Sequence, residues 1–199
     1  AGYVQPGSGS FPKMAKMNEF VLQCGALPTM TWLDGCSAGE EAIEELLEVA
    51  RSTGVVVFNI IPDRNYTPGT KDQKLTNLQK VVEICKDLNM PLLGGTEMNS
   101  PGQKFVDDFD SDELKPMHPY FLEGSRILHA HSTLQRLAGM GYLSPWSDDQ
   151  FASVAAKNEF YARFGEIFSP RGDEALQNDL SDSLGSGEVI SLAERVMTE

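Results

Sequence analysis

Apolar residues follow two alternating patterns along the first half of the chain. Continuous apolar runs, rich in β-branched and large side chains, predict strands. These runs lie at 27–33, 55–61 and 91–99, the last including its exit loop. Before each run, apolar residues recur every three or four positions, which is typical of amphipathic helices. These helices are expected at 14–24, 40–52 and 71–88.

This alternation predicts a parallel sheet. Helix followed by strand, three times over, implies βαβ units with right-handed crossovers. The run 55–61 is apolar throughout, which indicates a strand covered on both faces. Strand starts near 27, 55 and 92 fit a barrel or a doubly wound sheet. Three strands cannot close a barrel, so we expect parallel βα units that form part of a TIM-like barrel or an open sheet.

The pattern changes after residue 105. An acidic loop at 107–113 precedes segments with helical periodicity at 114–141, 148–168 and 188–197. No fourth strong strand is visible. We therefore divide the chain into a βα-repeat region, residues 1–105, and a mainly helical C-terminal region, residues 106–199, packed on it.

Composition narrows the classes of partner. The formal charge of −13 argues against nucleic acid and against an anionic membrane, because both need a basic face. No apolar run approaches the 18 residues of a membrane span, and no leader peptide is visible. Three widely spaced cysteines do not suggest a disulfide framework, so we expect a reducing, cytoplasmic location.

Polar residues cluster where the predicted strands end. In parallel α/β folds, ligands bind outside the carboxyl ends of the strands. The three exits contain Thr31, Trp32 and Asp34; Asn59, Asp63, Arg64 and Asn65; and Thr96, Glu97 and Asn99. Since the strands themselves are apolar, this contrast predicts a site for a small-molecule substrate at that edge.

Glu97 is the first candidate for chemistry. Side chains alternate along a strand, so Glu97 and Asn99 share one face. A carboxylate and a carboxamide two residues apart suit a divalent cation or a sugar hydroxyl. Gly94-Gly95 permits close approach of a ligand. The structural alternative is a carboxylate that caps a helix or pairs with an arginine.

The other exits offer further acid–base and binding groups, each with a structural alternative. Asp34 and Asp63 are candidate catalytic carboxylates, although both also suit turns. Arg64 is suited to hold a carboxylate or phosphate in a bidentate manner, or to pair locally with an aspartate. The remaining candidates for substrate contact are Asn59, Asn65 and Trp32, the last as an apolar wall or a packing residue.

The three histidines offer one candidate metal ligand. His118 lies in a loop or at a helix start, within reach of a site. His129 and His131 lie in a helical pattern, and residues two apart on a helix point in different directions. We therefore do not expect them to form a metal pair.

The segment Leu92-Leu93-Gly94-Gly95-Thr96-Glu97-Met98-Asn99 resembles a strand exit of metal-dependent hydrolase barrels, the PHP-like and amidohydrolase-like kind. The resemblance covers roughly residues 25–100. It implies a distorted barrel, divalent metal ions (Zn, Mn or Mg) and hydrolysis of a phosphoester or amide bond. It also implies that Glu97 matches a metal-bridging glutamate. The family's His-x-His on its first strand is absent from these strands, unless it lies upstream of Ala1.

Three functional hypotheses remain open. The first is a metal-dependent hydrolase, or its C-terminal portion, with Glu97, Asn99 and His118 near the metal. The second is a sugar-acid or sugar-phosphate isomerase-like or aldolase-like barrel, with Arg64 on the anionic group. The third is a non-catalytic half-barrel that acts as an assembly module, because an unclosed sheet has edges that need cover. A homo-oligomer or a missing N-terminal segment of the same protein would supply that cover.

Overall fold

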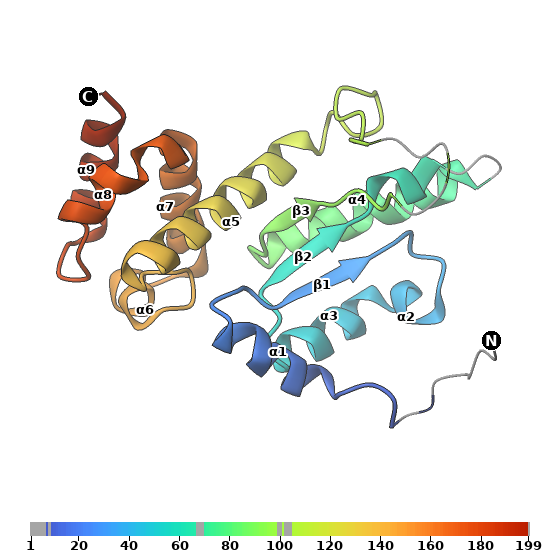
Figure 1. Cartoon of the computed structure of the whole chain (residues 1–199). Helices are drawn as coiled ribbons and strands as arrows, with labels where there is room; N and C mark the ends of the chain where they lie inside the picture. The colour runs from blue at the N-terminus through green and yellow to red at the C-terminus, as the bar shows by residue number, and fades with distance from the viewer. Residues whose placement is uncertain (1–6, 8, 67–69, 99–100, 102–104, 199) are drawn as a thin grey trace.

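The computed structural model describes residues 7, 9–66, 70–98, 101 and 105–198, except for the side chains of Asp63 and Tyr66. The chain is an α/β protein with three strands among helices (Figure 1). In chain order the elements are α1 Met14–Gln23, β1 Thr29–Trp32, α2 Ala38–Glu41, α3 Ile43–Ser52, β2 Val57–Ile60, η1 Pro62–Tyr66, α4 Lys71–Asp87, β3 Leu92–Gly94, α5 His118–Ala138, α6 Pro145–Gln150, α7 Val154–Ile167, η2 Pro170–Gly172, α8 Asp173–Asp179 and α9 Ser186–Thr198.

The predicted parallel sheet is confirmed. The strand order is β1-β2-β3, and both pairs are parallel. Thr31 lies opposite Asn59, and Asn59 lies opposite Leu93, so their side chains share one face. The sheet is open: its described strands do not close into a barrel.

Helices α3 and α4 cover one face of the sheet. Phe58 and Ile60 of β2 point to that side and are completely buried. They pack against apolar residues of both helices, including Leu47 and Leu78. Alternation along β2 sends Val57 and Asn59 to the opposite face. The sheet and these two helices therefore form a two-layer core.

Helix α5 crosses the opposite face over β3 (Figure 1). The contact is close because Gly124 faces the strand. A Cβ atom at Gly124 would lie 1.8 Å from the carbonyl oxygen of Leu92. Only glycine permits this approach of a helix to a strand. The cover reaches β3 but leaves Thr31 of β1 exposed.

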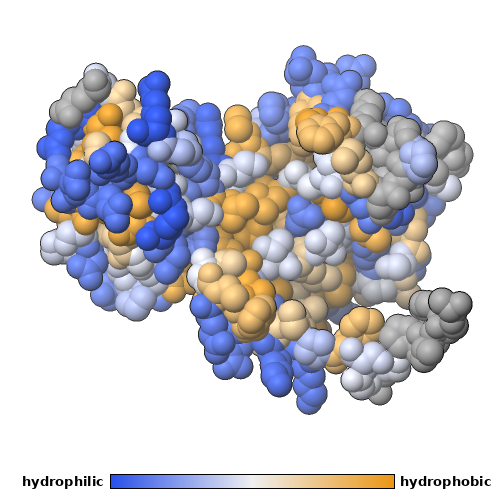
Figure 2. Space-filling model, viewed as in Figure 1, coloured by the Kyte–Doolittle hydropathy of each residue, from blue (hydrophilic) through white to orange (hydrophobic). Residues whose placement is uncertain are grey.

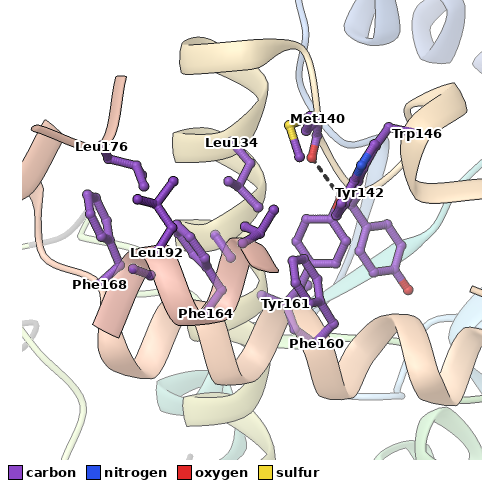
Figure 3. Packing of buried hydrophobic residues seen from close by; sticks show 14 of the residues in the cluster. Leu134, Met140, Tyr142, Trp146, Phe160, Tyr161, Phe164, Phe168, Leu176 and Leu192 are labelled. Atoms are coloured by element: carbon purple, nitrogen blue, oxygen red, sulfur yellow. Dashed lines mark hydrogen bonds between the residues drawn. The ribbon is translucent and has the colours of Figure 1, made fainter. Parts of the chain in front are cut away.

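The C-terminal helices build a second core around α5. Most of its aromatic and aliphatic side chains come from the helices α5 to α9 and the loop after α5 (Figure 3), and Leu27 and Val57 of the βα region join them. Tyr161 is completely buried and donates its hydroxyl hydrogen to the carbonyl oxygen of Met140 at 2.8 Å. The segments expected to be helical at 114–141 and 188–197 contain α5 and coincide with α9, whereas the segment 148–168 is divided between α6 and α7.

Two details of the predicted helices need correction. The helix expected at 40–52 is interrupted at Ala42, and just before the break the Glu40 carboxylate accepts hydrogen bonds from the N–H groups of Leu33 and Gly35. The amphipathic helix expected at 14–24 is α1, but its apolar side chains are largely exposed and Asn18 is its only buried residue. In the described part of the chain, no helix is both long and apolar enough to cross a membrane.

Candidate functional site

The carboxyl ends of the three strands form a polar rim beside the part of the sheet face that α5 leaves uncovered. On that face, the Asn59 amide lies 3.4 Å from the Thr31 hydroxyl. Gly95 follows β3 at the same level, and a Cβ atom there would lie 2.7 Å from Asn59 Oδ1. Glycine at this position therefore leaves the Asn59 side chain its room. Asn59 is half-buried, so it is accessible from the open face.

Glu97 and Arg64 meet at this rim. Arg64 Nε donates to Glu97 Oε2 at 2.5 Å, and the terminal Nη2 contacts the same oxygen. The side chains are 41% and 30% exposed, respectively, so the pair is open to solvent on one side. Two guanidinium nitrogens on one carboxylate oxygen hold the Glu97 side chain in one orientation.

A second ion pair lies at the exit of β1. Lys74 of α4 donates to Asp34 Oδ2 at 2.8 Å and to the carbonyl oxygen of Arg64 at 3.2 Å. Burial raises the pKa of Asp34, but the hydrogen bonds from Lys74 and from the Cys36 N–H outweigh it and leave that pKa lowered. Asp34 is therefore an ionised partner of Lys74, which ties the exits of β1 and β2 together.

Two residues that we expected to contact substrate are instead buried. Asn65 has no exposed surface, and its amide donates to the carbonyl oxygens of Leu33 and Ile61, both at 3.1 Å. Trp32 is 1% exposed and packs on the helix-covered face of the sheet. Substrate contact does not fit these positions, because both side chains are enclosed by protein.

The loop before α5 covers the end of β3. Asp107 is 5% exposed and accepts a hydrogen bond from the Thr96 hydroxyl at 3.0 Å. Phe109 packs over Gly94 and stacks on His118, with ring centroids 5.5 Å apart. His118 is the first residue of α5, and its ring is held by the stacked ring of Phe109.

Sequence reasoning missed Lys74 and Asp107. Both lie next to residues that it selected, yet each sits in a segment whose charges look like those of an ordinary solvated surface. Asp107 belongs to an acidic run in which one buried carboxylate has no distinguishing pattern. Lys74 could have been found by asking which cation near the start of α4 pairs with Asp34 at the exit of the neighbouring strand β1.

The structure describes only some of the candidate site residues. Asn99 lies outside the described residues, and so does the side chain of Asp63. Within the described part of the chain, no group of three or more His, Cys, Asp or Glu side chains could hold a metal ion. His129 and His131 do not form a pair: their Nε2 atoms bond separately to the carbonyl oxygens of Phe168 and Gly25.

Together, the open parallel sheet and its polar rim define an α/β protein with a candidate site at the strand ends. Comparison of the chain with protein-family models, with curated proteins and with solved structures returned no match in any of the three.

Proposed function

We propose that this chain is part of a TIM-barrel-type metal-dependent hydrolase that cleaves a phosphoester or amide bond in a small molecule. The observation that carries the proposal is the oriented carboxylate of Glu97, held through one oxygen by Arg64 at the carboxyl end of β3. Asn59 and Thr31 lie near the ends of the neighbouring strands β2 and β1, with the Asn59 amide 3.4 Å from the Thr31 hydroxyl. In parallel α/β folds this edge is where ligands bind.

The described residues do not by themselves make a complete metal site. Glu97 is a suitable oxygen ligand, but its neighbour at the rim is a guanidinium. A bound divalent metal would activate water and polarise the scissile bond. The chain's own contribution is to hold the Glu97 side chain in place through the Arg64 guanidinium.

A second candidate function is supported by the two cations at the rim. Arg64 lies at the exit of β2, and Lys74 of α4 reaches the rim, where it donates to the Arg64 carbonyl oxygen and pairs with Asp34. Arginine and lysine at a strand-end rim suit the anionic group of a sugar acid or sugar phosphate. An isomerase-like or aldolase-like reaction would then use Glu97 as its general base.

Thermal unfolding separates the two functions. Protein purified without chelator is titrated with Mn²⁺ or Zn²⁺, and in parallel with gluconate or inorganic phosphate in the presence of EDTA. A metal at about 100 times its Kd adds about 2.7 kcal/mol of stability. For a chain of this size that is a rise in Tm of roughly 5–10 °C. We expect this rise with metal, and its loss in Glu97→Gln.

Glu48→Gln is the matched control, because Glu48 is an exposed carboxylate on α3, far along the chain from the rim. It should keep the metal response. A shift with gluconate or phosphate in EDTA, lost in Arg64→Met, would favour the second function. The hydrolase proposal fails if added metal does not raise Tm and elemental analysis of the native protein finds only substoichiometric metal.

A further inference from the structure

The outer edge of β1 has unpaired backbone groups. The carbonyl oxygens of Pro28 and Trp32 both accept hydrogen bonds from β2 or the residues flanking it. Alternate residues of a strand point their N–H and C=O groups to the same side, so Thr29 and Thr31 point theirs away from β2. Both of these threonines are also exposed. The described sheet therefore ends at an edge open to another strand.

Helix α1 lies next to this edge with its apolar side chains uncovered. Phe20 is 58% exposed, and Met14 and Met17 are each more than 40% exposed. Figure 2 shows the resulting apolar area over α1. The buried Asn18 donates to the carbonyl oxygen of Thr53 at 2.8 Å, which places α1 beside the C-terminal end of α3. Helix α1 thus belongs to the helix layer of α3 and α4.

The repeat of helix and strand explains why α1 is uncovered. Helix α3 connects β1 to β2 and α4 connects β2 to β3, and each covers the pair of strands it connects (Figure 1). Helix α1 leads into β1 from the same layer, but the described sheet has no strand on its outer side. Nearly all parallel crossovers are right-handed, so a strand that led into α1 would lie parallel to β1 at its open edge.

We propose that a further β-strand pairs parallel with the open edge of β1 and lies beneath α1, continuing the β1-β2-β3 sheet. The same polypeptide supplies it, from a segment preceding α1, because only such a strand runs in the right direction and connects to α1. A second copy related by a two-fold axis would place its β1 antiparallel. The strand would cover Met14, Met17 and Phe20 and pair Thr29 and Thr31. This inference does not depend on the reaction at the rim.

Oxidation footprinting with hydrogen peroxide and mass spectrometry tests the proposal on two proteins: the chain of 199 residues and the whole polypeptide that its gene encodes. In the 199-residue chain, Met14 and Met17 should oxidise rapidly. In the whole polypeptide their oxidation should slow by about tenfold or more, as expected for burial. Met140, which is fully buried, should be slow in both, and Met197 on α9 should be unchanged between them.

Phe20→Asp provides the second measurement. In the 199-residue chain it should leave Tm nearly unchanged, because the side chain is exposed. In the whole polypeptide it should lower Tm clearly, since the charge would be buried against the added strand. The proposal is overturned if the gene encodes no strand-forming segment before α1, or if Met14 and Met17 oxidise equally fast in both proteins. Protection that appears in the 199-residue chain as its concentration rises would assign the edge to a second copy instead.

Discussion

The two regions of this chain differ in how completely they cover their own apolar surface. In the described part of the helical region, residues 106–199, three large apolar side chains are exposed: Val106, Leu122 and Val154. The described part of the βα region, residues 1–105, has nine, and they are Phe11, Met14, Met17, Phe20, Leu22, Leu33, Val49, Met98 and Phe105. The helical region buries nearly all of its large apolar side chains, partly against Leu27 and Val57 of the βα region. The βα region carries both the candidate site and the surfaces that remain to be covered.

The largest expected effect contrasts two phenylalanines, one from each region. Phe164 of α7 has no exposed surface and lies in the middle of the C-terminal core (Figure 3). Phe164→Ala should cost about 3–5 kcal/mol of unfolding free energy, because it leaves a cavity. Phe20→Ala should cost no more than about 0.5 kcal/mol in this chain. Urea unfolding measures both, and similar losses for the two variants would contradict the comparison.

A smaller effect concerns His131, which joins the two regions. It is 4% exposed, its Nε2 lies 3.0 Å from the Gly25 carbonyl oxygen, and its Nδ1 accepts the Tyr142 N–H at 3.0 Å. The ring is therefore neutral, with its hydrogen on Nε2. Burial lowers the pKa of His131, and the hydrogen bond to Gly25 offsets this only in part.

The sign of the pH dependence follows from that lowered pKa. The unfolded chain takes up a proton near pH 6.5, before the folded protein does. The stabilisation is thus complete above pH 6.5 and is lost as pH falls from there through the folded-state pKa. Each unit of difference corresponds to about 1.4 kcal/mol. His131→Gln should flatten the stability profile in this window, and an unchanged slope would show that other groups cause it.

Most of the fold could be predicted from local patterns. The runs at 27–33, 55–61 and 91–99 each contain a strand because apolar β-branched residues between helical segments leave few alternatives. Helix ends were less predictable, because they depend on contacts from elsewhere. Glu40 bonds back to the end of β1, and no periodicity in the sequence encodes that contact.

The candidate site was predictable in place but not in detail. The strand-end rule located Asp34, Asn59, Arg64 and Glu97 at one rim. The rule could not predict which of the exit residues turn inward. Asn65 is buried because its amide donates to carbonyl oxygens of two separate segments, those of Leu33 and Ile61. Long-range pairs such as Asp34 with Lys74 join residues that only the completed fold brings together.

Amide hydrogen exchange on the 199-residue chain tests the contrast between the two regions most directly. We expect the Thr31 N–H, at the open edge of β1, to be protected by less than about tenfold, whereas the N–H groups of Ile127 and Phe164 should exchange only through global unfolding. Protection of Thr31 equal to that of the helical core, at concentrations where the chain is monomeric, would contradict an uncovered sheet edge and the account built on it.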